Sequence, residues 1–170
     1  MLDAIGVKEF ITETGSKSES IIDALAEYGD SYYFWLIHPD SEPRRYEITG
    51  VPPVKWFKGI LEKLSNFDNL KNNWDDDGAL EIDLDAILAA IKLLAQIVKE
   101  ETPEPYVFPT VIGGIQIEWH TEKADLEIEI ESNRRIIVIF ENEIGEQKDW
   151  EQDLYFDDLS TLIEHVAKLV

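Results

Sequence analysis

The loop at 72–78 (NNWDDDG) carries oxygen-bearing side chains at the spacing of a calcium-binding loop. Four residues fit the first, third, fifth and sixth positions of that motif: Asn73, Asp75, Asp77 and Gly78. Glu81 fits the ninth position, but Leu84 stands at the twelfth, where the motif needs a bidentate Glu. We therefore take Asp75, Asp77 and Glu81 as candidate ligands for a divalent-metal-binding domain or a metal-dependent enzyme, with Glu118 and Glu127 as further carboxylates. The alternative is a turn in which Asp side chains accept hydrogen bonds from loop amides and the glycine takes a positive φ.

A second group of carboxylates lies where polar and apolar residues alternate strictly. Between 115 and 131 this period of two predicts two antiparallel strands, each with one buried face and one wet face. A tight turn at 122–123 pairs apolar residues with apolar residues throughout: Trp119 with Leu126, Ile117 with Ile128, and Ile115 with Ile130. The same register places Glu118 opposite Glu127 on the wet face. Gln116 then lies opposite Glu129.

The facing carboxylates of this hairpin repel each other. Arg134 or Arg135, a divalent cation or a basic partner would offset the repulsion. Alternatively, the carboxylates are screened by salt and tolerate each other. We predict that the acidic residues of this wet face bind a basic partner: Glu118, Glu127, Glu129 and Glu131. Paired carboxylates can also hydrolyse glycosidic bonds, but an open sheet face offers no pocket to separate their pKa values.

The sequence contains no complete motif for catalysis or cofactor binding. It has no cysteine, which excludes disulfides, thiolate zinc sites and a cysteine nucleophile. His38, His120 and His165 lie far apart and share no metal-ligand spacing, so each is interpreted as a solvated or strand-end residue. A GxSxG nucleophile elbow, a P-loop and a GxGxxG motif are all missing. The sequence therefore predicts a non-enzymatic protein without a cofactor.

The chain is strongly acidic, with 15 Lys and Arg against 36 Asp and Glu among 170 residues, a formal net charge of −21. Such a charge repels phosphate backbones and anionic membranes, so neither is an expected direct partner. Because 44% of the residues are hydrophobic, the chain can bury a core. Residues 40–71 are near neutral, whereas residues 101–170 hold 17 acidic and five basic residues, a charge of −12. This asymmetry favours a cationic partner, with solubility alone as the alternative explanation.

The hydropathy pattern predicts an α+β fold. Four helical segments are expected: about 2–28, from Pro52 and Pro53 to about 67, 84–99 with Asp83 as the N-cap, and from about 158 onward. The 84–99 helix is apolar on nearly all sides, which is typical of a helix buried at the centre of a domain. Strands are expected over 31–39 and 44–49, joined by a turn at 40–43, and over 134–140 and 146–154 beyond the 115–131 hairpin.

Together these elements predict a single domain over 1–170, with an antiparallel β-meander packed against a buried central helix, N-terminal helices and hairpin, and a C-terminal helix. The N-terminus has no pattern of a signal peptide. The most apolar stretch, 84–98, is too short and too polar to cross a bilayer. We therefore expect a cytoplasmic protein.

Two motifs within residues 70–131 resemble a loosely defined group of small, uncharacterised bacterial proteins. The first comprises Asn73, Trp74, Asp75, Gly78 and Ala79, just before the predicted central helix. The second comprises Pro105, Pro109, Gly113, Gly114 and Trp119. The chain departs from the group at Asp76, where the group usually has Gly, and it lacks the Pro that usually follows the Ala. The resemblance implies a bacterial origin and a shared fold, and it brings no established activity.

These observations predict an acidic interaction protein that binds a basic protein partner. Such a protein could be an immunity protein, an antitoxin or a small subunit of a bacterial assembly. One alternative is the metal-binding function described above. Another is a nucleic-acid mimic, whose carboxylates imitate phosphates and occupy a nuclease or a DNA-binding protein. Mimicry would need carboxylates spaced along a groove-like track.

Overall fold

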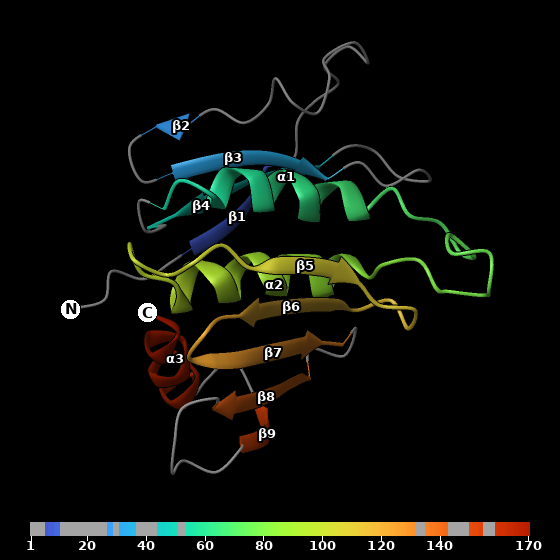
Figure 1. Ribbon diagram of the computed structural model, residues 1–170. Coiled ribbons are helices and arrows are strands. Elements are labelled where there is room, and N and C mark those ends of the chain that lie inside the picture. The colour runs from blue at the N-terminus through green and yellow to red at the C-terminus, as the bar shows by residue number, and fades with distance from the viewer. Residues whose placement is uncertain are drawn as a thin grey trace.

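The computed structural model describes residues 6–10, 27–28, 31–36, 44–50, 54–131, 135–142, 150–154 and 159–170. These residues form two antiparallel sheets and three α-helices (Figure 1). The predicted α+β class, the meander, the buried central helix and the C-terminal helix are confirmed.

The smaller sheet has the strand order β1-β4-β3-β2. Its strands are β1 (Gly6–Phe10), β2 (Glu27–Tyr28), β3 (Ser31–Leu36) and β4 (Arg44–Thr49). The predicted hairpin is confirmed, because β3 pairs antiparallel with β4 from Ser31 to Leu36. The predicted turn at 40–43 lies outside the described residues.

The larger sheet is a meander with the strand order β5-β6-β7-β8-β9. Its strands are β5 (Tyr106–Pro109), β6 (Ile115–His120), β7 (Ala124–Ile130), β8 (Ile136–Asn142) and β9 (Trp150–Leu154). The predicted register of β6 and β7 is confirmed, including the pairing of Trp119 with Leu126. The hydroxyl of Thr121 organises the turn between them by accepting the amides of Lys123 and Ala124.

Helix α2 (Leu84–Ile97) lies between the two sheets and contacts β1 on one side and β6 and β7 on the other (Figure 1). Asp83 caps it as predicted, because its Oδ1 accepts the amide of Asp85 at 2.7 Å. Nearly all its apolar side chains are buried, and they join both sheets in one hydrophobic cluster. Helix α1 (Phe57–Phe67) packs against β3, α2 and β5, and α3 (Ser160–Val166) packs against α2.

The prediction of a helix over 2–28 is wrong for those residues of the range that the structure describes. Gly6–Phe10 and Glu27–Tyr28 are strands, and the rest of the range lies outside the described residues. Pairing with β4 holds β1 in place and brings Val7 opposite Ile48. This contact joins residues far apart in the chain, so a local helical pattern could not reveal it.

Strand β5 was not predicted either. The strand is four residues long and ends at Pro109, and Pro105 lies directly before its first residue. Prolines interrupt the alternation that marks a strand, yet a proline is tolerated where a strand has a neighbour on one side only. In this sheet β5 pairs with β6 alone, and Tyr106 lies opposite Glu118.

Two indoles fix the chain just before β5. Trp56, at the start of α1, donates its Nε1 hydrogen to the carbonyl of Thr102 at 2.9 Å. Trp119 of β6 donates in the same way to the carbonyl of Pro103 at 2.8 Å. Because neighbouring carbonyls are bound from two different elements, the position of β5 against the rest of the sheet is closely determined.

His165 of α3 is a buried titratable residue against the larger sheet. Its ring stacks on that of Phe140 with 4.2 Å between the centroids, and only 8% of the residue is exposed. Its Nδ1 lies 3.5 Å from Nζ of Lys168. Burial, and to a smaller extent the Lys168 cation, lowers the pKa of His165 below its ordinary value of 6.5, while Glu164 acts weakly in the opposite direction.

We expect acid to destabilise the fold through His165. Since its pKa is lower in the folded state than in the unfolded state, the unfolded chain binds this proton first as the pH falls. The stability due to the neutral ring is therefore fully present above pH 6.5 and is lost as the pH falls through the folded-state pKa. A His165→Phe variant keeps a ring against Phe140 and should lack this part of the decline below pH 6.5. Urea unfolding at several pH values measures it, and an unchanged slope in the variant would contradict it.

Candidate functional site

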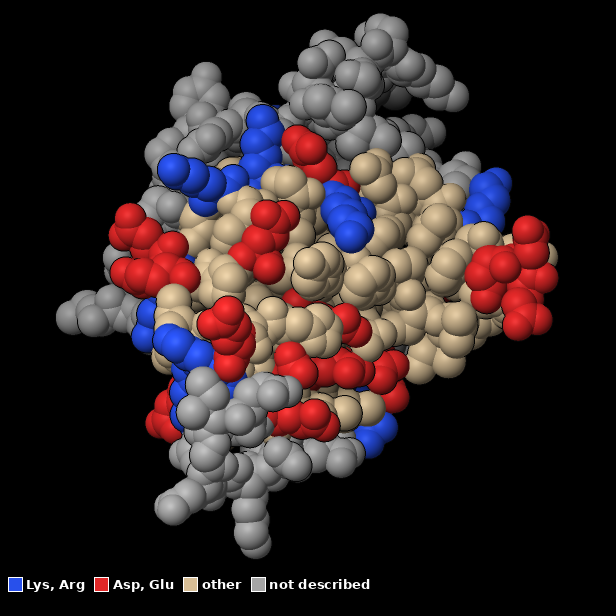
Figure 2. All heavy atoms as spheres, viewed as in Figure 1, with Lys and Arg blue, Asp and Glu red and all other residues tan. Residues whose placement is uncertain are grey.

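Three of the four predicted partner-binding carboxylates lie on the face of the larger sheet that points away from α2, and the fourth, Glu131, follows directly after β7. We define this outer face by alternate residues on four strands: Tyr106 and Phe108 of β5; Gln116, Glu118 and His120 of β6; Asp125, Glu127 and Glu129 of β7; and Ile137, Ile139 and Glu141 of β8. Figure 2 shows acidic side chains as a band across the sheet. In the strand register this band lies next to an aromatic row on β5, and on its other side Ile137 and Ile139 of β8 separate it from the acidic positions of β9.

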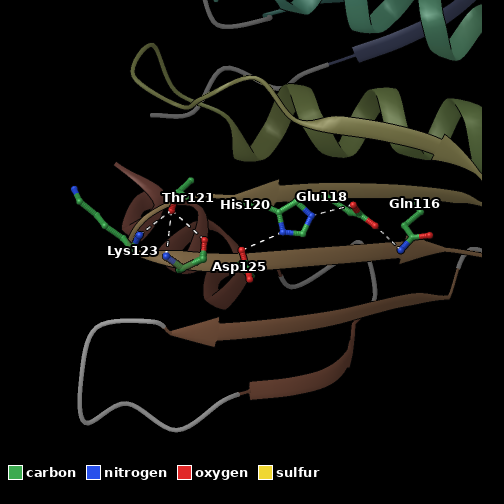
Figure 3. Close-up of polar contacts among 7 residues, drawn as sticks. Gln116, Glu118, His120, Thr121, Lys123 and Asp125 are labelled. Atoms are coloured by element: carbon green, nitrogen blue, oxygen red, sulfur yellow. Dashed lines mark hydrogen bonds and ion pairs between the residues drawn. The ribbon is translucent and has the colours of Figure 1, made fainter.

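Three carboxylates of the outer face belong to one continuous network, and Figure 3 shows the part of it from Gln116 to Asp125. The amide of Gln116 donates to Oε1 of Glu118 at 2.8 Å and to Oε1 of Glu127 at 2.7 Å. The ring of His120 lies between Glu118 and Asp125, with Nε2 3.1 Å from Glu118 Oε2 and Nδ1 3.0 Å from Asp125 Oδ1. Five side chains from two strands are thus linked from Glu127 to Asp125.

Two pKa shifts follow from this network. Hydrogen bonds to Glu118 first and Asp125 second raise the pKa of His120 above 6.5. Burial raises the pKa of Glu127 above 4.5, and the nearby charge of Glu118 adds to the effect. A protonated His120 donates from both ring nitrogens and has no lone pair with which to accept a proton. In its protonated form His120 therefore carries a positive charge between two carboxylates.

The repulsion between Glu118 and Glu127 is partly offset within the hairpin itself, by hydrogen bonds to Gln116 and His120. The sequence suggested Arg134, Arg135, a divalent cation or a basic partner for this role. Arg135 instead pairs with Glu131, just beyond β7, with 3.4 Å between Nη1 and Oε1. Arg134 lies outside the described residues.

Two aromatic rings are exposed beside the carboxylates. Tyr106 is 59% exposed and Phe108 is 41% exposed, and their rings stack with 6.5 Å between the centroids and 13° between the planes. The Tyr106 ring also lies 6.4 Å from that of His120. On the other side, Nζ of Lys63 in α1 lies 5.2 Å from the centre of the Phe108 ring. The aromatic row is thus held in place while much of its surface faces solvent.

The 72–78 loop is organised by its own side chains. Oδ1 of Asp75 accepts the amides of Asp77 and Ala79, both at 2.9 Å, and these bonds, that from Ala79 first, lower the pKa of Asp75 below 3.8. Gly78 has a φ of +97°, and its amide is bound by the side chain of Asn73. This is the turn that the sequence offered as the alternative to a calcium loop. Within the described residues, no group of three His, Asp or Glu side chains is arranged to hold a metal ion. Asp75, Asp77 and Glu81 therefore do not form such a group.

We expect Asp75→Ala to lower the melting temperature and Asp77→Ala to leave it nearly unchanged. The first change removes the oxygen that accepts two loop amides, while no hydrogen bond of the Asp77 side chain organises the loop in the same way. Thermal unfolding with and without added calcium measures both variants. If calcium raised the melting temperature of the wild type and both substitutions abolished that rise, the loop would be a metal site after all.

Sequence patterns identified Glu118, Glu127 and Glu129 of the outer face but missed Asp125, the aromatic row and the role of His120. The exposed rings of Tyr106 and Phe108 belong to β5, the strand that was not predicted because prolines interrupt its alternation. His120 was interpreted as a solvated strand-end residue, and it is indeed exposed at the end of β6. Because residues alternate between the two faces of a strand, Glu118 and His120 lie on the same face, and this pattern could have predicted their contact.

No described helix is long and apolar enough to cross a membrane. Comparison of the chain with models of protein families, with curated proteins and with solved structures found no match.

Proposed function

We propose that this chain is a non-enzymatic interaction protein whose outer face binds a basic segment of a protein partner. One observation carries the proposal: a band of carboxylates runs beside two exposed, stacked aromatic rings on β5, a strand at the edge of the sheet. An acidic surface that served solubility alone would not need exposed aromatic side chains at its margin.

The two kinds of side chain have different physical roles. Aromatic residues supply much of the affinity at protein interfaces, because they bury a large area at a small cost in conformational entropy. Carboxylates steer a cationic partner and select it over other proteins. Burial already raises the pKa of Glu127, so a Lys or Arg brought next to it would stabilise its ionised form.

The outer face supports this function better than nucleic-acid mimicry. β7 carries acidic residues at alternate positions: Asp125, Glu127 and Glu129, with Glu131 following. The adjacent strand β6 offers one carboxylate, Glu118, between Gln116 and the imidazole of His120. A mimic of duplex nucleic acid needs two long rows of negative charge, and exposed aromatic rings such as those on β5 have no counterpart on a phosphate backbone. An immunity protein, an antitoxin or an assembly subunit remains the proposed kind of protein.

A phage-displayed library of random 12-residue peptides, panned on the immobilised protein at low salt, tests the proposal. We expect the selected peptides to be rich in Lys and Arg interspersed with apolar residues, and their binding to weaken steeply with salt. In fluorescence anisotropy, Tyr106→Thr/Phe108→Thr and Glu127→Gln/Glu129→Gln should each weaken the best peptide by about tenfold.

The matched control is Glu100→Gln/Glu101→Gln, which removes the same charge at exposed positions after α2. It should change affinity less than about twofold, because surface charges away from the contact matter little. Threonine is used in place of the aromatic residues since it retains β-propensity. Selection of no peptide, selection of peptides without basic residues, or equal losses in the control and the outer-face variants would each refute the proposal.

A further inference from the structure

An open depression of about 420 Å³ lies where the loop before α2 meets the turn between β5 and β6. Its apolar lining includes Leu80 and Ile112, which are 54% and 48% exposed. Val111, 57% exposed, stands beside Ile112 without lining the depression. Large aliphatic side chains at such exposure, gathered at one place, are typical of a contact surface.

Backbone hydrogen bonds join the two loops that line the depression. The amide of Leu80 donates to the carbonyl of Val111, and that of Asp83 donates to the carbonyl of Gly113, both at 2.9 Å. Gly113 has a φ of +85°, and a Cβ at this position would lie 2.8 Å from the carbonyl oxygen of Glu81. The indole of Trp74 binds the carbonyl of Leu80 at 2.9 Å and steadies the loop from its other side. The depression is thus part of the folded framework.

The charged residues that line the depression are Glu81 and Asp83, both acidic. Figure 2 shows further acidic side chains gathered over the loop between α1 and α2, beside a continuous uncharged surface. An occupant with an apolar side chain and neighbouring cations would complement this surface. An acidic occupant would be repelled.

The depression is also close to the outer face. Phe108 and Ile112 are four residues apart, so their Cα atoms lie at most about 14 Å from each other. An extended segment of five residues spans about 16 Å. One short segment of a partner is therefore long enough to place its cations on the outer face and its last side chain at the depression.

We propose that the depression binds an aliphatic side chain of the same basic segment that the outer face binds. The recognised chemistry is then a run of Lys or Arg that ends in a residue such as Leu. This inference rests on the proposed function and deepens it, because it specifies the partner's sequence pattern and its direction along β5.

Two synthetic peptides test the inference, acetyl-Lys-Lys-Lys-Lys-Leu-amide and the same peptide with Ser in place of Leu. Titration into ¹⁵N-labelled protein should show about tenfold tighter binding of the Leu peptide, the gain expected from partial burial of one aliphatic side chain. Both peptides should shift the amide signals of the outer face. Only the Leu peptide should shift those of Leu80 and Gly113.

Two variants locate the anchor. Leu80→Ser/Ile112→Ser should abolish the preference for Leu, whereas Val111→Ser, an equally exposed apolar residue outside the lining, should retain it. Shifts on the outer face without any preference for Leu would overturn this inference and leave the proposed function standing. If neither peptide shifted the outer face, the proposed function would fail as well. Shifts confined to the depression would overturn the idea of one shared segment.

Discussion

A Gly114→Ala substitution is expected to lower the free energy of unfolding by about 3 kcal/mol, the upper end of the range for overpacked positions. A Cβ at residue 114 would lie 2.5 Å from the carbonyl oxygen of Ile130 and 2.9 Å from Oγ1 of Thr110. The first of these atoms belongs to the backbone of β7, so no change of rotamer can relieve the contact. The added methyl group must push β6 away from β7 or distort the turn that leads into it.

Gly59→Ala is the matched control for this prediction. Gly59 is exposed within α1, and a Cβ there would have no atom within 4 Å. Alanine is favoured over glycine inside a helix, so this variant should gain about 0.5–1 kcal/mol. Urea unfolding followed by circular dichroism measures both changes. A loss below about 1 kcal/mol for Gly114→Ala would mean that the close approach of β6 and β7 can relax at little cost.

Trp119→Ala should destabilise the fold by about 3–5 kcal/mol, the cost of removing a large aromatic side chain from a core. The residue is 1% exposed and pairs with Leu126 across β6 and β7. Small domains have a total stability of about 5–15 kcal/mol, so much of the variant would unfold at moderate urea concentrations. Intrinsic fluorescence would be altered by the loss of the indole, so circular dichroism is the suitable measurement.

A Trp119→Phe variant separates the contribution of the hydrogen bond to stability from the contribution of the buried ring. Phenylalanine fills most of the space but leaves the carbonyl of Pro103 without its indole donor, at a cost of about 1–3 kcal/mol. Trp74→Phe, which removes an indole bond to Leu80 at an exposed position, should cost less. If Trp119→Phe were as stable as the wild type, the hydrogen bond to Pro103 would have no measurable role in placing β5.

The position of β5 connects these stability predictions to the proposed function. Trp119 holds the segment before β5, and Gly114 allows β6 to approach β7, so both residues set the distance between the aromatic row and the carboxylates. Neither side chain lies on the outer face. A weakened peptide affinity in Trp119→Phe, with its loss of stability taken into account, would therefore report displacement of the rings and not loss of a contact.

The sequence alone determined the central part of this protein. Strict alternation over 115–131 set the register of β6 and β7, because a slip of one residue would turn every apolar side chain to solvent. The apolar surface of the 84–99 segment required a buried helix, and Asp83 marked its start. In both cases the signal is local, since it depends on the period of one element and on a cap next to it.

Tertiary contacts decided what local patterns could not show. Gly6–Phe10 is a strand because β4 pairs with it, and Tyr106–Pro109 is a strand because β6 does. That second pairing alone brings two exposed rings next to the acidic band. The sequence identified Glu118, Glu127 and Glu129 of the outer face, but the folded chain supplied Gln116 and His120 as the groups that hydrogen-bond its carboxylates. The depression at Leu80 likewise arises from two loops that meet only in the folded protein. Contacts between distant segments depend on three-dimensional packing, which the period of a single element does not contain.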